Sequence, residues 1–259
     1  MTPDSIHQCA RSLTVGPFTI CENIYPADGV QTRHAHDKGS MTLMLAGSLR
    51  EQVNKREVHA RPLSMVVKPV GTEHANRFGG RGAHTLQLRI DDDAATDGVL
   101  RDWRWDHCNF AVRDFLAVLR LLRADDRPAA EIAAYDLLST VGESPMRTPG
   151  SPRWLLDVCA HIDDLLPGSV RVDDVARAAS VHPVYLARQF RRFFNSSVTG
   201  YIAAGRAQHA AQLLCDTPSR LADAALRAGY SDQSHMTRAL RAATGLTPRA
   251  LQRLLTGQV

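Results

Sequence analysis

Two stretches in the last third of the chain decide its fold. They are VDDVARAASVHPVYLARQFRRFF, residues 172–194, and LADAALRAGYSDQSHMTRALRAATGLTP, residues 221–248. Each predicts a short helix, a turn and a second helix, because apolar residues recur at helical spacing on both sides of a break. The second helix of each pair keeps arginine on the face away from its apolar residues. A helix of this kind is suited to the major groove of DNA.

In the first stretch the break falls at residues 180–183, and Pro183 suits the first turn of the helix that follows, where its missing N–H is no loss. Leu186, Phe190 and Phe193 recur at helical spacing and predict the buried stripe of that helix. The face left for solvent carries Val184, Ala187, Arg188 and Arg191.

The second stretch follows the same plan. Gly229 ends its first helix, at a position that tolerates positive φ, and Ser231 is the expected N-cap of the next helix. Met236 and Leu240 are expected to face inward. The outward face carries Ser234, His235, Arg238 and Arg241.

The two units are in register with one another. The residues of four pairs lie 50 positions apart: Leu186 and Met236, Arg188 and Arg238, Phe190 and Leu240, and Arg191 and Arg241. This spacing predicts an internal duplication of a small helical module. Any single amphipathic helix can carry arginine on its wet face, but two such helices in register, each behind a turn, favour DNA reading.

The segment resembles the C-terminal DNA-binding domain of the AraC/XylS family of bacterial transcription regulators. The resemblance covers about residues 152–253, and its most specific parts are AGYSDQSH at 228–235 and GLTP at 245–248. It implies seven helices, with two helix-turn-helix motifs joined by a long helix. Thr247 is expected to cap, and Pro248 to open, the final helix.

The family's motif also implies roles for individual side chains. The positions that contact bases are Val184, Ala187, Arg188, Ser234, His235 and Arg238, and those better placed for phosphates are Arg191, Gln233 and Thr237. The chain departs from the family at Asn195, where glycine is usual, and at Ala224, where isoleucine is usual. It also has His182 where serine or threonine is usual, which predicts a weaker cap for that recognition helix.

The first ninety residues predict short strands at 18–21, 41–45, 65–68 and 85–90. These apolar or alternating segments are separated by turn-forming clusters at 26–29, 47, 69–71 and 79–82. Short strands at regular spacing indicate an antiparallel barrel or sandwich.

A histidine pattern lies within these strands. His34 and His36 are expected on one face of a strand, and the Pro-Val-Gly turn at 69–71 is expected to bring His74 beside them. The pattern resembles the two motifs of the cupin superfamily. It departs from them at Ser40, where the first motif has glutamate, and at Phe78, where the second has asparagine.

The three histidines could hold a divalent metal with open positions for water or an effector. The alternative is a barrel without metal whose polar residues bind an organic ligand. Asn76, two residues after His74, is expected to point the same way, and Glu73 to be a solvated surface charge. Because the motif glutamate is missing and no paired acid and base lies near the histidines, we expect no catalysis.

Between these regions the sequence predicts two helices and a linker. Residues 110–123 carry a helical apolar stripe, a second helix is expected to open at Pro128 and run through Ile132, Tyr135 and Leu138, and residues 142–152 are expected to form the linker. In the family such helices commonly make the dimer contact, and packing on the chain's own barrel explains the stripe equally well.

The charge supports a division of the chain. Residues 151–259 have 13 Arg, no Lys, 8 Asp and no Glu, for a net charge of +5, whereas residues 1–150 carry −1. We predict an α+β two-domain protein, with a cupin-like sensor at 1–95, a helical connector and linker at 96–150, and an all-α double helix-turn-helix domain at 151–259. The excess of arginine favours bidentate contacts to guanine and phosphate.

No apolar run reaches the roughly 18 residues that a membrane span needs, and the N-terminus lacks a signal-peptide pattern. The five cysteines are odd in number and have no paired spacing, which indicates a reduced, cytoplasmic protein.

We expect a transcription regulator whose partners are promoter DNA, a small-molecule effector, a second copy of the chain and, if it activates, RNA polymerase. The effector would bind one arrangement of the protein more tightly than another, and would thereby shift the orientation or pairing of the DNA-binding domains. Two alternatives remain open at this point: a metal-dependent cupin enzyme with a basic helical tail, and a DNA-binding regulator that needs no effector.

Overall fold

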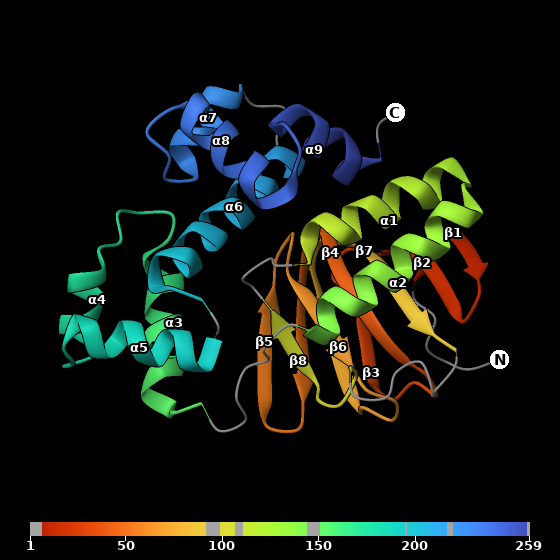
Figure 1. The fold of residues 1–259 in the computed structure, drawn as a ribbon, viewed down its shortest axis with the longest axis horizontal. Helices are drawn as coiled ribbons and strands as arrows, with labels where there is room; N and C mark the ends of the chain where they lie inside the picture. The colour runs from red at the N-terminus through yellow and green to blue at the C-terminus, as the bar shows by residue number, and fades with distance from the viewer. Residues whose placement is uncertain are drawn as a thin grey trace.

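The computed structural model describes residues 7–91, 99–106, 111–143, 151–194, 196–216 and 220–257. The N-terminal part is an antiparallel β domain, two helices pack along it, and a helical domain follows (Figure 1). This arrangement confirms the predicted α+β class.

Eight strands form one antiparallel sheet in the described part of the chain. They are β1 (Gln8–Val15), β2 (Phe18–Tyr25), β3 (Val30–His34), β4 (Gly39–Val53), β5 (Arg56–Ala60), β6 (Met65–Lys68), β7 (His74–Ile90) and β8 (Arg104–Asp106). All four predicted strand segments are confirmed, in β2, β4, β6 and β7. The sheet also takes in β8, which lies beyond residue 95 and pairs with β6.

The sheet folds around its two longest strands, β4 and β7. The first part of β4 pairs with β6 and its last part with β5. The first part of β7 pairs with β3 and its last part with β2. An apolar cluster that includes Met44, Leu49, Val66, Phe78 and Trp105 lies between these parts of the sheet.

The predicted turns at Gly47 and at 79–82 are wrong, because β4 and β7 run through them. Gly47 pairs with Ala83 across the two strands, and the register shifts on both sides of this point. Gly47 and Gly82 have φ of +76° and +69°. A Cβ on Gly47 would collide with the carbonyl oxygen of Gly82. The glycines therefore permit a bulge and a close approach of two backbones, which is the other common use of glycine in strands.

Two helices, α1 (Val112–Ala124) and α2 (Arg127–Glu143), follow the sheet. The predicted stripe of α1 is buried: Val112, Phe115, Leu116, Leu119 and Leu122. In α2 the predicted face is only partly right. Ile132 and Tyr135 are 65% and 46% exposed, whereas Ala130, Ala134, Leu137 and Val141 are fully buried. The small side chains of the alanines let α2 pack closely. The predicted face omitted them because it was defined by the large apolar residues.

Residue 142 was predicted to begin the linker, but Gly142 and Glu143 still belong to α2. Residues 144–150 of the predicted linker lie outside the described residues. Pro152 is the N-cap of the helix that follows.

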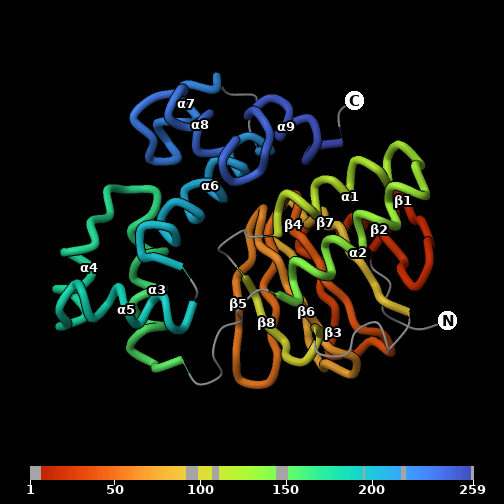
Figure 2. The backbone as a smooth tube through the Cα atoms, in the orientation of Figure 1, coloured from red at the N-terminus to blue at the C-terminus, as the bar shows by residue number. Residues whose placement is uncertain are grey.

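The C-terminal domain contains seven helices in its described residues, as the family resemblance implied. They are α3 (Arg153–Leu165), α4 (Val172–Ala178), α5 (Pro183–Phe194), α6 (Val198–Asp216), α7 (Leu221–Arg227), α8 (Gln233–Thr244) and α9 (Pro248–Thr256). Helix α6 joins the two helix-turn-helix units, and Figure 2 shows the chain passing through it from one unit to the other.

The two units have different surroundings. The first, α3 to α5 with the start of α6, has an apolar cluster of its own that includes Phe190 and Tyr201. The second, from the later part of α6 to α9, shares one continuous core with the sheet and α1. In Figure 1, α8 and α9 lie over α1 and one end of the sheet, whereas α3 to α5 lie to the side. The β domain therefore rests mainly on the second unit.

No helix in the described residues is both long and apolar enough to cross a membrane.

Candidate nucleic-acid interface and histidine site

Helix α5 is anchored by its aromatic side. Leu186, Phe190 and Phe193 are buried, as their spacing predicts. The helix begins at Pro183, and the backbone N–H of Val184 donates to Nδ1 of His182 at 3.2 Å. His182 thus supplies a capping acceptor at the position where the family has serine or threonine.

The opposite face of α5 is available to a ligand. Val184 is 69% exposed, Arg188 and Arg191 are exposed, and Ala187 is half-buried. The Arg188 guanidinium lies 5.9 Å from the ring centre of Tyr185, and Tyr185 stacks on Trp154. Tyr185, which no sequence pattern marked, limits with its ring the freedom of the arginine that the family motif assigns to base contact.

Helix α8 has a stronger cap than α5, and the predicted cap residue is wrong by one position. The N-cap is Asp232 rather than Ser231, since Oδ1 of Asp232 accepts from the backbone N–H of His235 at 2.7 Å. Ser231 donates its hydroxyl to the other oxygen of Asp232 at 3.1 Å. The hydrogen bond from the His235 backbone, followed by that from Ser231, lowers the pKa of Asp232.

The outward face of α8 carries exposed Gln233, Ser234 and Arg238. His235 and Thr237 are half-buried. The His235 ring lies edge-on to Tyr230, with centres 5.1 Å apart, and its Nδ1 is 3.2 Å from the Ser231 hydroxyl. Thr237 donates its hydroxyl to the carbonyl of Gln233 at 2.8 Å. His235 is therefore held in one orientation, while Arg238 is free to reach outward.

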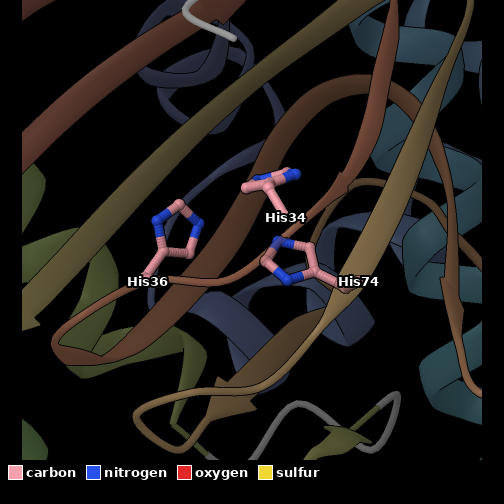
Figure 3. A group of neighbouring side chains, drawn as sticks. All are labelled: His34, His36 and His74. Carbon is pink, nitrogen blue, oxygen red and sulfur yellow. The ribbon is translucent and has the colours of Figure 1, made fainter. Parts of the chain in front are cut away.

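Three histidines converge at one end of the sheet. His34 ends β3, His74 begins β7 and the two are cross-strand partners. His36 lies just beyond β3, so the prediction that it shares a strand with His34 is wrong. The backbone N–H of Gly71 donates to the His36 carbonyl at 2.9 Å, which ties the two loops together. Figure 3 shows the three rings turned toward one another, and one nitrogen from each lies within 4.8 Å of the others.

The hydrogen bonds of the rings determine which nitrogens are free. Nδ1 of His34 donates to the carbonyl of Thr32 at 2.7 Å, and Nδ1 of His74 donates to the carbonyl of Thr72 at 2.9 Å. Their Nε2 atoms are buried and have no hydrogen-bond partner among the described residues. Two imidazole lone pairs are thus oriented and unused, as in histidines that bind a metal.

Burial and positive charge keep His36 and His74 neutral. Burial, followed by the nearby Lys68 ammonium, lowers the pKa of His74 to about 3 and that of His36 to about 4. Only a neutral imidazole can donate a lone pair to a metal.

A carboxylate is present near the histidines, but not at the motif position. Ser40, which replaces the motif glutamate, is buried and faces Gln87. Glu51 is fully buried and forms an ion pair with Lys68. Its Oε2 accepts from the indole N–H groups of Trp103 and Trp105, each at 2.8 Å. Burial would raise the pKa of Glu51, but Lys68 and these donors hold it below its usual value.

Sequence patterns gave no signal for this cluster, because its four members come from β4, β6 and the β8 region. Asn76, by contrast, was expected to point into the pocket. It is buried on β7 and donates from Nδ2 to Oε1 of Gln31 at 2.8 Å. Its own Oδ1 has no partner among the described residues. Glu73 is on the surface and pairs with Arg33, as expected of a solvated charge.

Comparisons with known proteins bear on the helical domain. The helix-turn-helix domain family matches residues 175–254. An uncharacterized HTH-type transcriptional regulator of Bacillus subtilis (strain 168), YobQ, is 22% identical over 228 residues, which is 86% of this chain and 89% of that protein.

Two similar solved structures differ in how much of the chain they cover. ToxT from Vibrio cholerae is 9% identical with a TM-score of 0.41, over 93% of this chain and all of that one. The C-terminal domain of AraT, a response regulator from Geobacillus stearothermophilus, is 25% identical with a TM-score of 0.39, over 40% of this chain and 87% of that one.

Two helix-turn-helix units joined by one long helix define a DNA-binding regulator of transcription. The matched residues lie within the segment that resembles the DNA-binding domain of AraC/XylS regulators, and the N-terminal sheet domain stands where the sensor was expected.

Proposed function

We propose that this protein binds a specific promoter sequence through α5 and α8 and that a ligand held at His34, His36 and His74 changes its affinity for that DNA. The observation that carries the proposal is the equivalence of the two helices. Each buries an apolar stripe and exposes an arginine at the same position, Arg188 in one and Arg238 in the other. Two such surfaces on one chain suit adjacent major grooves.

Base reading and phosphate binding are divided between the outward side chains. Arg188 and Arg238 are exposed and long enough to reach base edges, where arginine binds guanine with two hydrogen bonds. Arg191, one turn after Arg188, and Gln233, at the start of α8, are exposed where a helix end meets the DNA backbone. Val184, Ala187, Ser234, His235 and Thr237 complete the proposed contact surface.

The three histidines fit a divalent metal. Zinc, nickel and iron sites accept imidazole nitrogen, and the free Nε2 atoms of His34 and His74 are already oriented by their backbone hydrogen bonds. A bound ion would offer open coordination positions to an anionic or chelating effector. We expect Asn76, whose Oδ1 has no partner among the described residues, and Lys68, whose charge lowers the pKa of His36 and His74, to add hydrogen bonds to that effector.

The rival function is a metal-dependent cupin enzyme. Among the described residues, the buried carboxylate beside the histidines is Glu51, and it is already held by Lys68, Trp103 and Trp105. It is therefore poorly placed to serve as a general base. This arrangement supports a binding pocket over a catalytic one.

Helix α1 connects the β domain, which holds the three histidines, with helix α8. Helix α1 lies on the sheet, and its Arg113 donates to the carbonyls of Arg241 and Ala242 at the end of α8, at 3.4 and 2.6 Å. An effector that binds one arrangement of the sheet and α1 more tightly than another would favour that arrangement. Through the contacts of Arg113, the favoured arrangement would then change the position of α8.

The experiment is an electrophoretic shift assay of the full chain on its own promoter and on random DNA, over a range of salt, with and without added zinc. We expect specific binding that depends steeply on salt and changes with the metal. Equal affinity for both DNAs would contradict the DNA-reading part of the proposal. An affinity that zinc does not change would contradict the sensor part.

A further inference from the structure

A cavity that includes none of the three histidines lies between the sheet and α6. It has a volume of about 590 Å³. His59, Arg61 and Arg81 line it from the β domain, and His209, Gln212 and Asp216 line it from α6. Figure 1 shows α6 passing beside this end of β4 and β5. Small-molecule sites in proteins occupy about 300–1,000 Å³, so the cavity has the size of a ligand site.

The walls of the cavity are fixed by packing on both sides. Ala207, Ala210, Ala211 and Leu214 of α6 are buried in the core that they share with the sheet. Beside the cavity, the buried side chain of Gln208 donates to the hydroxyl of Ser64 at 3.3 Å. The cavity is therefore complete only while α6 is docked on the β domain.

The positive charge of the cavity is only half balanced. Arg81 is paired with Asp216, at 2.7 Å, and also donates to the Asp216 carbonyl. Arg61, which is half-buried, donates from Nη1 to Nε2 of His209 at 2.9 Å, and a neutral imidazole is its acceptor. No carboxylate within the described residues lies within 4.0 Å of the Arg61 guanidinium.

The neighbours of Arg61 respond to this unbalanced charge. Burial, followed by Arg61, lowers the pKa of both His209 and His59. Burial raises the pKa of Asp163 on α3, and the hydrogen bond from Tyr201, followed by the charge of Arg61, opposes that rise. Asp163 thus offsets part of the Arg61 charge without forming an ion pair with it. An anion in the cavity would balance Arg61 and accept hydrogen bonds from its guanidinium, which suits carboxylate and phosphate groups.

We infer that this cavity binds a small polyanion with carboxylate or phosphate groups, held by the Arg61 guanidinium of the β domain beside His209 of α6. Because the ligand would touch both parts, it would bind the docked arrangement more tightly than any arrangement in which α6 has moved away. The consequence for DNA affinity rests on the proposed function, but the binding itself does not. The cavity shares no residue with the three-histidine site and would act in addition to it.

The test uses isothermal titration of the full chain with pyrophosphate, with citrate and with uncharged sorbitol. We expect the wild type to bind at least one of the two anions and not sorbitol. Arg61→Gln should weaken that binding by about ten-fold, the loss of one charge-assisted hydrogen bond. Arg77→Gln, which removes an exposed arginine from β7 outside the cavity, should leave it unchanged.

Arg61→Lys covers the case in which the glutamine variant does not fold, because it keeps the charge and loses the planar fork. It should bind more weakly than the wild type and melt at the same temperature. No heat from pyrophosphate or citrate, or equal loss in the Arg61 and Arg77 variants, overturns the inference. Retained anion binding in a protein that fails to bind DNA would refute the proposed function and leave this site standing. A preference for one anion identifies the group that the cavity recognises.

Discussion

Arg123 of α1 holds the carboxylate of Glu22 on β2 with two hydrogen bonds, from Nε at 3.2 Å and from Nη2 at 2.5 Å. The remaining nitrogen of the guanidinium donates to the carbonyl of Leu254 in α9 at 2.7 Å. One arginine thus joins the sheet, the connector helix and the last helix of the DNA-binding domain. The pair is largely buried, with side-chain exposures of 17% and 5%.

Arg123→Met should destabilise the protein by about 3–5 kcal/mol, because it removes a permanently charged partner from the buried Glu22 carboxylate and leaves it the contact with His84. Urea unfolding of the full chain measures the change. Arg120→Met removes an exposed arginine from the same helix and should cost less than about 0.5 kcal/mol. Similar losses in both variants would mean that the Glu22 contact contributes little.

The same carboxylate predicts a dependence of stability on pH. Burial would raise the pKa of Glu22, but hydrogen bonds from His84 and Arg123 lower it from 4.5 to about 2. The folded state therefore binds this proton less readily than the unfolded state. The stabilisation of about 3 kcal/mol is fully present above about pH 5 and is lost as the pH falls toward 2.

We expect the unfolding free energies of the wild type and Glu22→Gln to converge as the pH is lowered from about 5 to about 3. Glu57→Gln, which alters an exposed residue of β5, should follow the wild type over the whole range. A constant difference between the wild type and Glu22→Gln would show that the carboxylate does not titrate in this interval.

The sequence predicted the elements whose pattern is local. The stripe of α1, the cores of α5 and α8 and the short strands all follow from residues that are near one another in the chain. Thr247 and Pro248 open α9 as expected, and the hydroxyl of Thr247 accepts from the backbone of Ala250. The N-cap of α8 was misplaced by one residue because Ser231 and Asp232 are both good caps, and only the backbone geometry distinguishes them.

The errors came from features that depend on distant residues. Gly47 reads as a turn in sequence, but its backbone approaches Gly82 in another strand. Glu51 and Lys68 form a pair across the sheet that no local pattern predicts. The convergence of His34, His36 and His74 was predicted, because the spacing of the cupin motifs implies how the strands that position these histidines pair.

The next prediction concerns base reading. Arg188→Ala and Arg238→Ala should each weaken binding to the promoter by about 1–3 kcal/mol and binding to random DNA far less. Both side chains are exposed and have no carboxylate partner among the described residues. Fluorescence anisotropy at fixed salt measures both affinities. Arg56→Ala, which removes an exposed arginine from β5 of the other domain, serves as the charge-matched control. Equal losses on the two DNAs would show that the arginines contact only phosphate.

The two helices also predict the shape of the footprint. With α5 and α8 joined by the 19-residue helix α6, one protomer should protect two adjacent major grooves on one face of the duplex, about 34 Å apart. Hydroxyl-radical footprinting measures the spacing. Arg188→Ala should weaken protection in one groove and Arg238→Ala in the other. Protection confined to a single groove in the wild type would overturn the claim that both units read DNA.

The last prediction concerns the histidine site. His34 and His74 each present a buried Nε2 whose ring is already oriented by a backbone carbonyl, and His36 completes a set within 4.8 Å. Protein purified without a histidine tag and incubated with zinc, nickel or iron should retain about one ion per chain by elemental analysis, as three nitrogen ligands allow. His74→Ala should lose the ion. His161→Ala, an exposed histidine of α3, should keep it. If the wild type retains no metal and His74→Ala still responds to the effector, then neither the metal nor the effector binds at these residues.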